Sequence, residues 1–339
     1  MSDSRETMTI IIPVKNRPLL ITRCLDSIKA QTWRPIRIIV VDNGSDDDTP
    51  QRVAEWAQAN DSDGLHTDLF VEPTPGQAAA RRRGIDETRS RLVMHFDSDD
   101  TMRPDSVRNA VEALDPSLPD PAELYLFRVL RHFPDGSSSV SRDTSTAGLL
   151  ARQLVHCPVA TQNFAATTDL VRRAGSWDIR LRCWEDWELG IRLILNARKT
   201  VSSKYVGADL ICHAHSVTGT EHHSRFGLWE EAIDRVEQNL DASSLTALRY
   251  VAYRRAILAA HYTRELRSLQ SNRPTDISLA ETRLLDSHIR SVRAAAAELL
   301  RKALHAPYIN PLQRLYLRAA YLYTSLGGRG AAIPAPLFF

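Results

Sequence analysis

Cysteine is scarce in this chain, and the cysteines that are present lie far apart. The 339 residues include four, Cys24, Cys157, Cys183 and Cys212, with no Cys-x-x-Cys pair among them. A thiolate zinc site or a disulfide framework needs closely and regularly spaced cysteines, so we expect neither. Reduced thiols packed in the interior are the simpler interpretation.

Long apolar runs are absent as well. No stretch approaches the roughly 18 to 20 apolar residues that a membrane-spanning helix needs. The start, MSDSRETMTIII, is polar and acidic before a short strand-like run, unlike a signal peptide. Hydrophobic residues make up 43% and charged residues 25% of the chain, which is typical of a globular protein. We therefore expect a cytoplasmic protein.

The net charge of +2 conceals an asymmetry between two parts of the chain. Residues 1–224 hold 27 basic and 31 acidic side chains, whereas residues 225–339 hold 16 and 10. The first part alternates apolar strand patterns with helical ones, and the second indicates successive amphipathic helices. We predict a domain at 1–224, a helical subdomain at 225–327 and a flexible tail at 328–339.

The first part has the pattern of a parallel sheet. Apolar strands are expected at 8–14, 36–42, near 69–71 and at 91–96, with helices between them. Asn16 is expected to cap the helix that begins near Pro18. Further along, 128–140 indicates a hairpin with a Pro-Asp-Gly turn, and 161–171 a strand. Apolar strands that alternate with helices favour an α/β sheet covered on both faces.

Three carboxylates crowd the end of the last of these strands. Asp97, Asp99 and Asp100 fall within four positions, and like charges at that spacing repel unless a cation lies among them. Ligands of such sheets bind beyond the carboxyl ends of the strands. Mg²⁺ and Mn²⁺ prefer carboxylate, water and phosphate oxygens. The cluster therefore indicates half of a metal site, whose other half is a diphosphate ligand.

Five segments together resemble a known family. IIIPVKNR, IIVVDNGSDDDT, GQAAARRRG, HFDSDD and WEDWELGIRL occur in this order over roughly residues 8–220, and the set is similar to the family 2 glycosyltransferases. The resemblance implies an α/β fold of the GT-A type, which has a Rossmann-like, mostly parallel central sheet with helices on both faces. A C-terminal α-helical subdomain would follow it. It also implies a bacterial enzyme of glycan or polysaccharide synthesis.

The resemblance assigns roles to particular positions. Asp42 would hold the uracil or ribose of the donor, Arg81 would lie near its nucleotide or diphosphate, and Asp97 and Asp99 would bind Mn²⁺ or Mg²⁺. His215 would be a third metal ligand. The residues implied in donor binding are Pro13, Val14, Asn16, Asp42, Gly76, Arg81, Asp97 and Ser98. The chain departs from the family at Asn43 and Arg82, where an Asp and an Asn are usual.

A second acid pair, Glu185 and Asp186, begins a predicted helix. Two interpretations are open: the acids stabilise the helix dipole, or one of them is a catalytic base. The metal site favours the second, because sugar transfer needs both a Lewis acid at the leaving diphosphate and a base at the acceptor hydroxyl. By resemblance, Asp186 is the general base of an inverting single displacement, with Glu185 beside it. Weaker candidates for acceptor contact are Trp184, Trp187 and Asn163.

Several partners and alternatives follow. We expect a nucleotide-sugar donor, by resemblance a UDP-sugar, and a glycan or lipid-linked sugar as acceptor. No nucleic acid is expected, because the N-terminal part is acidic and has no reading motif. The C-terminal helices either pack on the catalytic domain or a second copy of the chain, or contact the inner face of the membrane peripherally. The rival functions are a sugar nucleotidyltransferase and a non-catalytic nucleotide-sugar-binding module.

Overall fold

The computed structural model describes residues 6–141, 145–155, 157–212 and 222–240. The chain divides into two compact units, one of Met1–Leu149 with Cys157–Gly219 and the other of Leu150–His156 with Thr220–Phe339. The first unit contains the whole sheet. The described residues of the second unit are 150–155 and 222–240. The first range belongs to the short helix α5 (Leu149–Val155), whose first residue lies in the first unit, and the second includes helix α8 (His222–Asn239).

A nine-stranded sheet organises the first unit, in the order β3-β2-β1-β4-β8-β6-β9-β5, with β7 paired to β6. The strands are β1 (Met8–Val14), β2 (Ile36–Asp42), β3 (Leu65–Val71), β4 (Leu92–His95), β5 (Thr101–Met102), β6 (Leu124–His132), β7 (Ser138–Val140), β8 (Phe164–Thr167) and β9 (Thr200–Ile211). Strands β3, β2, β1 and β4 run parallel, as do β6 and β9. Strand β8 is antiparallel to both β4 and β6. The expected mostly parallel sheet is therefore confirmed.

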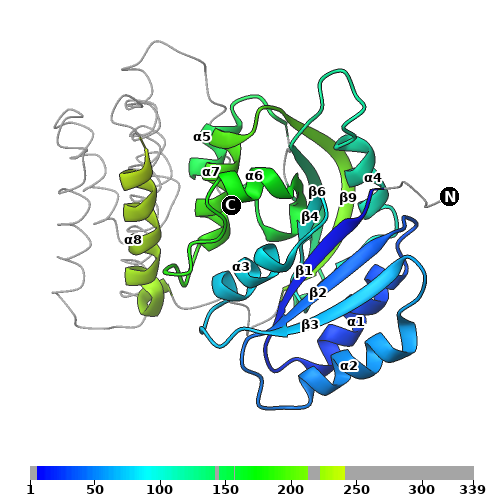
Figure 1. Cartoon of the computed structure of the whole chain (residues 1–339). Coiled ribbons are helices and arrows are strands. Elements are labelled where there is room, and N and C mark those ends of the chain that lie inside the picture. The colour runs from blue at the N-terminus through cyan, green and yellow to red at the C-terminus, as the bar shows by residue number, and fades with distance from the viewer. Residues whose placement is uncertain (1–5, 142–144, 156, 213–221, 241–339) are drawn as a thin grey trace, which may run out of the picture. The chain divides into compact units, whose positions relative to one another are not determined.

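Helices cover both faces of this sheet (Figure 1). The helices of the first unit are α1 (Pro18–Lys29), α2 (Thr49–Asn60), α3 (Gln77–Glu87), α4 (Ser106–Ala113), α6 (Thr168–Arg173) and α7 (Glu185–Asn196). Alternate residues of β1 enter different cores: Ile10 and Ile12 pack with α1, α2 and α4, and Ile11 packs with α3 and α7. A strand buried on both faces has no polar side, which explains its continuous apolar sequence.

One glycine permits close packing of α3 on the sheet. A Cβ at Gly84 would lie 2.3 Å from Cγ2 of Ile11, closer than any side chain allows. Glycine at this position therefore lets α3 approach β1. Helix α3 also carries Arg81, one of the predicted site residues.

The expected helix after the first strand is confirmed, but its cap is not. Ile21, Leu25 and Ile28 are buried on one side of α1. Arg17, not Asn16, occupies the N-cap position, and no side chain caps the helix. Asn16 adopts a left-handed conformation, with φ +52°, and its Oδ1 accepts a hydrogen bond from the Asp46 amide at 3.0 Å. The prediction was wrong because this side chain joins two loops instead.

The segment predicted as a strand at 161–171 contains three elements. A 3-10 turn, η1 (Thr161–Asn163), precedes β8, and α6 begins at Thr168. The Thr167 hydroxyl accepts a hydrogen bond from the Leu170 amide at 3.2 Å and so caps α6. Because this cap starts a helix, the strand ends at Thr167. The predicted hairpin is confirmed, with Leu130 opposite Val140.

Several expectations concern residues that the structure does not describe. The helices expected at 241–327, the tail at 328–339 and His215 all lie outside the described residues. The domain limits at 224 and 327 stay predictions. No helix within the described ranges is both long and apolar enough to cross a bilayer. All four cysteines are described, and none of them forms a disulfide.

Candidate active site

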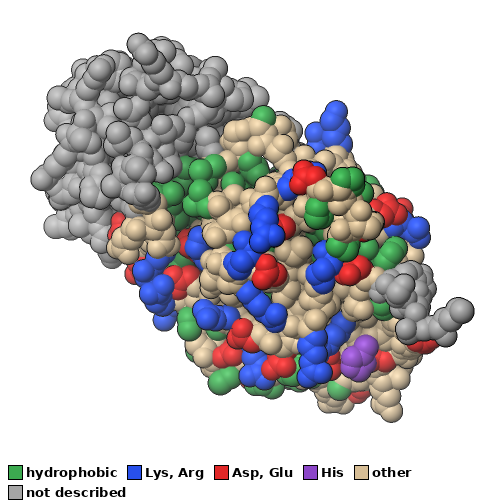
Figure 2. Space-filling model, turned by 45° about the horizontal axis from the view of Figure 1, so that its top comes forward, with side chains coloured by type: hydrophobic (Ala, Val, Ile, Leu, Met, Phe, Trp, Pro, Cys, Tyr) green, Lys and Arg blue, Asp and Glu red, His purple; other side chains and the backbone are tan. Residues whose placement is uncertain are grey.

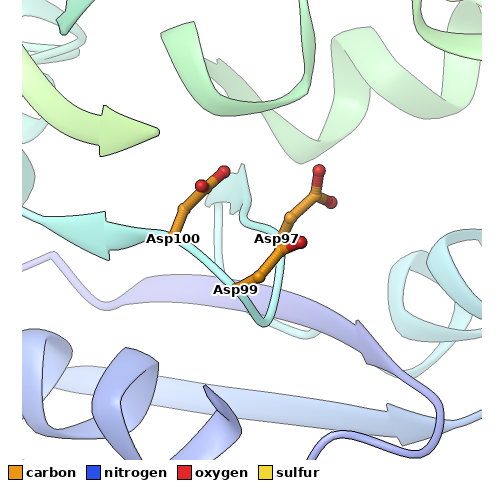
Figure 3. A group of neighbouring side chains, drawn as sticks. All are labelled: Asp97, Asp99 and Asp100. Carbon is orange, nitrogen blue, oxygen red and sulfur yellow. The ribbon is translucent and has the colours of Figure 1, made fainter. Parts of the chain in front are cut away.

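The three acids of the cluster lie on the turn between β4 and β5. One carboxylate oxygen from each of Asp97, Asp99 and Asp100 lies within 4.8 Å of the others. In Figure 3, Asp97 and Asp100 project to the same side of this turn. Three carboxylates brought this close supply the hard oxygen ligands that Mg²⁺ and Mn²⁺ favour. The donor set therefore fits the divalent ion that the sequence predicts.

Protein donors already contact these carboxylates. Asp97 accepts a hydrogen bond from Nη2 of Arg81 at 2.7 Å and another from the Gln162 amide. Asp99 forms an ion pair with Arg17. Asp100 accepts one hydrogen bond from the Gln162 amide and one from a backbone N–H of β9, both at 3.0 Å.

Asp100 differs from its two neighbours in its surroundings. It is 5% exposed, and burial first, then the charges of Asp97 and Asp99, raise its pKa to about 8. The N–H that binds its Oδ1 belongs to Ile211, the last residue of β9. Asp100 therefore fastens the end of β9 to the turn, which leaves Asp97 and Asp99 as the better placed metal ligands.

Arg81 joins the two acid clusters that the sequence separates. Its guanidinium is within 2.7 Å of Asp97 and, through Nη1, within 3.2 Å of Oε1 of Glu185. The side chain is 2% exposed, and its Cζ lies 4.7 Å from the centre of the Trp177 ring. Burial lowers the pKa of Arg81, but the two carboxylates raise it further, so the net shift is upward and the group stays protonated.

The second cluster begins helix α7. Glu185 and Asp186 lie in its first turn, where the helix dipole stabilises negative charge. Burial and then the neighbouring charge of Glu185 raise the pKa of Asp186 to about 6, although Arg81 and the Trp187 N–H act in the opposite direction. The Trp187 N–H donates to Asp186 at 2.8 Å. The carboxylate is thus oriented, ionised at neutral pH and more basic than an ordinary Asp.

Trp184 holds an uncommon backbone conformation directly before these acids. Its φ is +55° and ψ is 26°, in the left-handed region that bulky side chains avoid. Its ring meets that of Trp187 edge-on at 5.5 Å between centroids. Trp187 is 1% exposed and belongs to the interior, whereas Trp184 is half-buried. Of the two candidates, Trp184 is the one with surface left for an acceptor.

The candidate nucleoside site lies at the ends of β1 and β2. Asp42 is 4% exposed and accepts hydrogen bonds from the Ser45 hydroxyl at 2.5 Å and the Ser45 amide at 3.2 Å. The same hydroxyl accepts a hydrogen bond from the backbone N–H of Asn16 at 2.9 Å. Pro13 and Val14 are buried at the end of β1. These contacts bring the loops after the two strands together around Asp42.

Asn43, one of the two positions where the sequence departs from the family it resembles, is held by three hydrogen bonds. Its Nδ2 donates to the carbonyl oxygens of Glu72, at 2.9 Å, and Thr74, at 2.8 Å, and its Oδ1 accepts from the Gly76 amide at 2.7 Å. Gly76 has a φ of +125°, which favours glycine. Asn43 therefore shapes the loop that leads into α3.

The remaining candidates are placed less favourably. Asn163 is 5% exposed, and both ends of its side-chain amide form hydrogen bonds with the backbone. Its Oδ1 accepts from the Ala160 N–H and its Nδ2 donates to the Pro158 carbonyl oxygen, each at 2.7 Å. It shapes its own turn. Ser98 is buried in the turn between β4 and β5. Arg82 is exposed and Arg83 pairs with Glu87 at 2.7 Å.

Sequence reasoning missed two contributors. Gln162 carries no motif, and only the fold brings it to the acids. Arg17 lies inside IIIPVKNR, and the need for a positive charge near the acids was a signal that could have singled it out. On the face drawn in Figure 2, acidic and basic side chains of the described residues are interspersed.

Comparison with known proteins agrees with this geometry. The sequence profile "Glycosyl transferase family 2" matches residues 9–145, which include all of β1 but its first residue, β2 to β7 and the acid cluster. Residues 9–145 are therefore similar to the family 2 glycosyltransferases. Glycosyltransferase GlyA of Streptococcus pneumoniae is 34% identical over 103 residues, which are 30% of this chain and 14% of that protein.

The chain spans between 13% and 54% of the length of eight curated relatives that it matches, which is less than two thirds of each.

Solved structures share the fold of this chain at low sequence identity. TarS 1-349 of S. aureus in complex with UDP-GlcNAc is 15% identical, with a TM-score of 0.62 over 94% of this chain and 90% of that one. The mannosyltransferase PcManGT of Pyrobaculum calidifontis, in complex with GDP-Man and Mn²⁺, is 17% identical, with a TM-score of 0.55 over 96% of this chain and 87% of that one. The fold is therefore that of GT-A glycosyltransferases.

Proposed function

We propose that this chain transfers a sugar from a nucleotide-diphospho-sugar, by resemblance a UDP-sugar, to a hydroxyl of a glycan or lipid-linked acceptor, with inversion. The bacterial synthesis of cell-surface polysaccharide or glycolipid is the setting we propose. One observation carries the proposal: Arg81 contacts both Asp97 and Glu185, so the donor-side acids and the acids of α7 belong to one site. Sugar transfer needs such a pair of acidic groups.

Asp97 and Asp99 are the residues that would hold a divalent ion, Mn²⁺ or Mg²⁺. Such an ion supplies Lewis-acid stabilisation of the diphosphate as it leaves. The third proposed ligand, His215, lies outside the described residues. The relative crystallised with GDP-Man and Mn²⁺ supports this choice of ion class.

The chain's own residues would remove the acceptor proton and bind the nucleoside and the acceptor sugar. Asp186 takes the proton from the acceptor hydroxyl, and its pKa of about 6 makes it a stronger base than an ordinary Asp while it stays ionised at pH 7. Glu185 is held beside it by Arg81. Asp42 contacts the nucleoside, and Trp184 offers an indole face to the acceptor sugar. The acceptor oxygen displaces the diphosphate directly, without a covalent sugar–protein intermediate.

The test is a panel of nucleotide sugars added with Mn²⁺ to the full chain. A ligand at 100 times its Kd raises the free energy of unfolding by about 2.7 kcal/mol, which a thermal melt detects. The best stabiliser should also release its nucleoside diphosphate in the presence of acceptor. Release of pyrophosphate from a nucleoside triphosphate would instead identify a nucleotidyltransferase. Stabilisation without any release would identify a binding module, and no stabilisation at all would contradict the proposal.

Peripheral contact with the inner face of the membrane is a separate proposal. It concerns the basic helices expected near the C-terminus, which suit an anionic surface. Flotation of the full chain with anionic and neutral liposomes tests it, and equal recovery from both would contradict it.

A further inference from the structure

Arg81, Gln162 and Arg17 donate to the carboxylates proposed to bind the metal, and these side chains differ in how firmly they are held. Arg81 is 2% exposed and also contacts Glu185, Gln77 and the ring of Trp177. Gln162 is 9% exposed and bonds to two carboxylates at once. Neither side chain can leave without breaking several buried contacts. Both are fixed parts of the site.

Arg17 is held differently. Its side chain is 24% exposed, and within the described residues the ion pair with Asp99 is the one partner of its guanidinium. Its backbone is fixed, because its N–H donates to the Thr49 hydroxyl at 2.8 Å. The arginine is therefore anchored at its Cα beside the acids, while its charged end can exchange one partner for another.

The backbone of Asp99 does not depend on that ion pair. Arg23 donates through Nη2 to the carbonyl oxygen of Asp99 at 2.5 Å, so the turn keeps its shape when the Asp99 carboxylate changes partner. A divalent ion bound by this carboxylate competes with the guanidinium for the same oxygens. It also repels the guanidinium, because both are cationic.

We propose that Arg17 is an exchangeable counter-ion: it neutralises Asp99 in the metal-free protein, is displaced when the ion binds, and then contacts the phosphate oxygens of the donor. This inference rests on the proposed function. Guanidinium groups bind phosphate through paired N–H donors, and the donor diphosphate would carry the negative charge nearest to the released side chain. Arg17 would thus weaken binding of the metal ion alone and strengthen binding of the nucleotide in the presence of the metal ion.

Because Arg17 is proposed to have opposite effects on Mn²⁺ affinity and on nucleotide affinity, the variant Arg17→Gln gives a direct test. This substitution removes the charge and keeps a side chain of similar length. Titration with Mn²⁺ alone, followed by the electron paramagnetic resonance signal of free Mn²⁺, should show binding tighter by about threefold or more, since a competing ion pair is removed. Titration with UDP at saturating Mn²⁺ should show binding weaker by about tenfold, since a charge-assisted contact is lost.

Lys29→Gln is the matched control, because it also removes one positive charge from helix α1, but at the exposed C-terminal end, opposite the N-cap residue Arg17. There Lys29 donates a hydrogen bond to Asn60. It should change neither affinity by more than about twofold. Arg17→Lys, which keeps the charge but loses the paired donors, should fall between wild type and Arg17→Gln. It serves as the second variant if Arg17→Gln does not fold.

A purely structural role for Arg17 predicts the reverse sign, because a loosened Asp99 would bind Mn²⁺ more weakly. Equal or weaker Mn²⁺ binding by Arg17→Gln would therefore overturn the inference, while wild-type binding of Mn²⁺ and UDP leaves the proposed function standing. Absence of Mn²⁺ binding by the wild type would overturn both.

Discussion

Removal of the Arg81 charge tests whether the two acid clusters are really held together by one side chain. Arg81→Met keeps the apolar length of the side chain and deletes the guanidinium. Asp97 and Glu185 then lose the cation that both contact, at 2.7 and 3.2 Å. Two carboxylates that repel each other remain in a largely enclosed place.

The magnitude follows from how deeply each partner is buried. Breaking a buried charge pair by removal of one partner costs about 3–5 kcal/mol, because the other charge stays desolvated. The Glu185 side chain is 12% exposed and bears most of this cost, whereas Asp97 is 26% exposed and regains some solvation from water. Loss of the contact with Trp177 adds about 0.5–2 kcal/mol. We expect unfolding to become easier by about 4 kcal/mol, near the low end of the combined range because Asp97 is partly solvated, and this is a large part of the stability of an ordinary domain.

Urea unfolding at pH 7, followed by tryptophan fluorescence, measures this difference. Arg82→Met is the matched control, since Arg82 is the next residue of α3 and is exposed; its substitution should cost less than about 0.5 kcal/mol. Equal losses for the two variants at pH 7 would refute the reasoning.

Two further predictions concern the base and the donor loop. Because the pKa of Asp186 is raised to about 6, turnover at saturating donor should rise with pH through about 6 and level off above it. Glu185→Gln should move this midpoint to lower pH by removing a like charge, and a midpoint unaffected by it would argue against Asp186 as the titrating group. Asn43→Asp should lower the free energy of unfolding by about 1–3 kcal/mol, because carboxylate oxygens would face the carbonyls of Glu72 and Thr74. Unchanged melting of this variant would show that the amide does not brace the loop.

The sheet could be predicted because its signal is local. Continuous apolar strands such as β1 and β2, separated by helical patterns, leave few arrangements other than a parallel sheet covered on both faces. The acids at strand ends could be assigned to one edge for the same reason. The cap of α1 was mispredicted because Asn16 has a partner, the Asp46 amide, that comes 30 residues later in the chain.

The side-chain contacts within the site could not be predicted from the spacing of residues in the sequence. Arg81 and Glu185 are 104 residues apart, and Gln162 and Asp97 are 65 apart. Only the packing of α3, η1 and α7 against the same end of the sheet decides which of many arginines and glutamines meets an acid. Asn43, which looked like a departure from the family, has a structural role that no local pattern reveals.

The central claim is that donor binding and proton removal belong to different acids of one site. Measurement of the Kd for the Mn²⁺–nucleotide complex and of kcat, side by side in wild type and Asp186→Asn, tests it most directly. We predict an unchanged Kd and a kcat lower by about 10² or more. Undiminished turnover by Asp186→Asn would contradict the account.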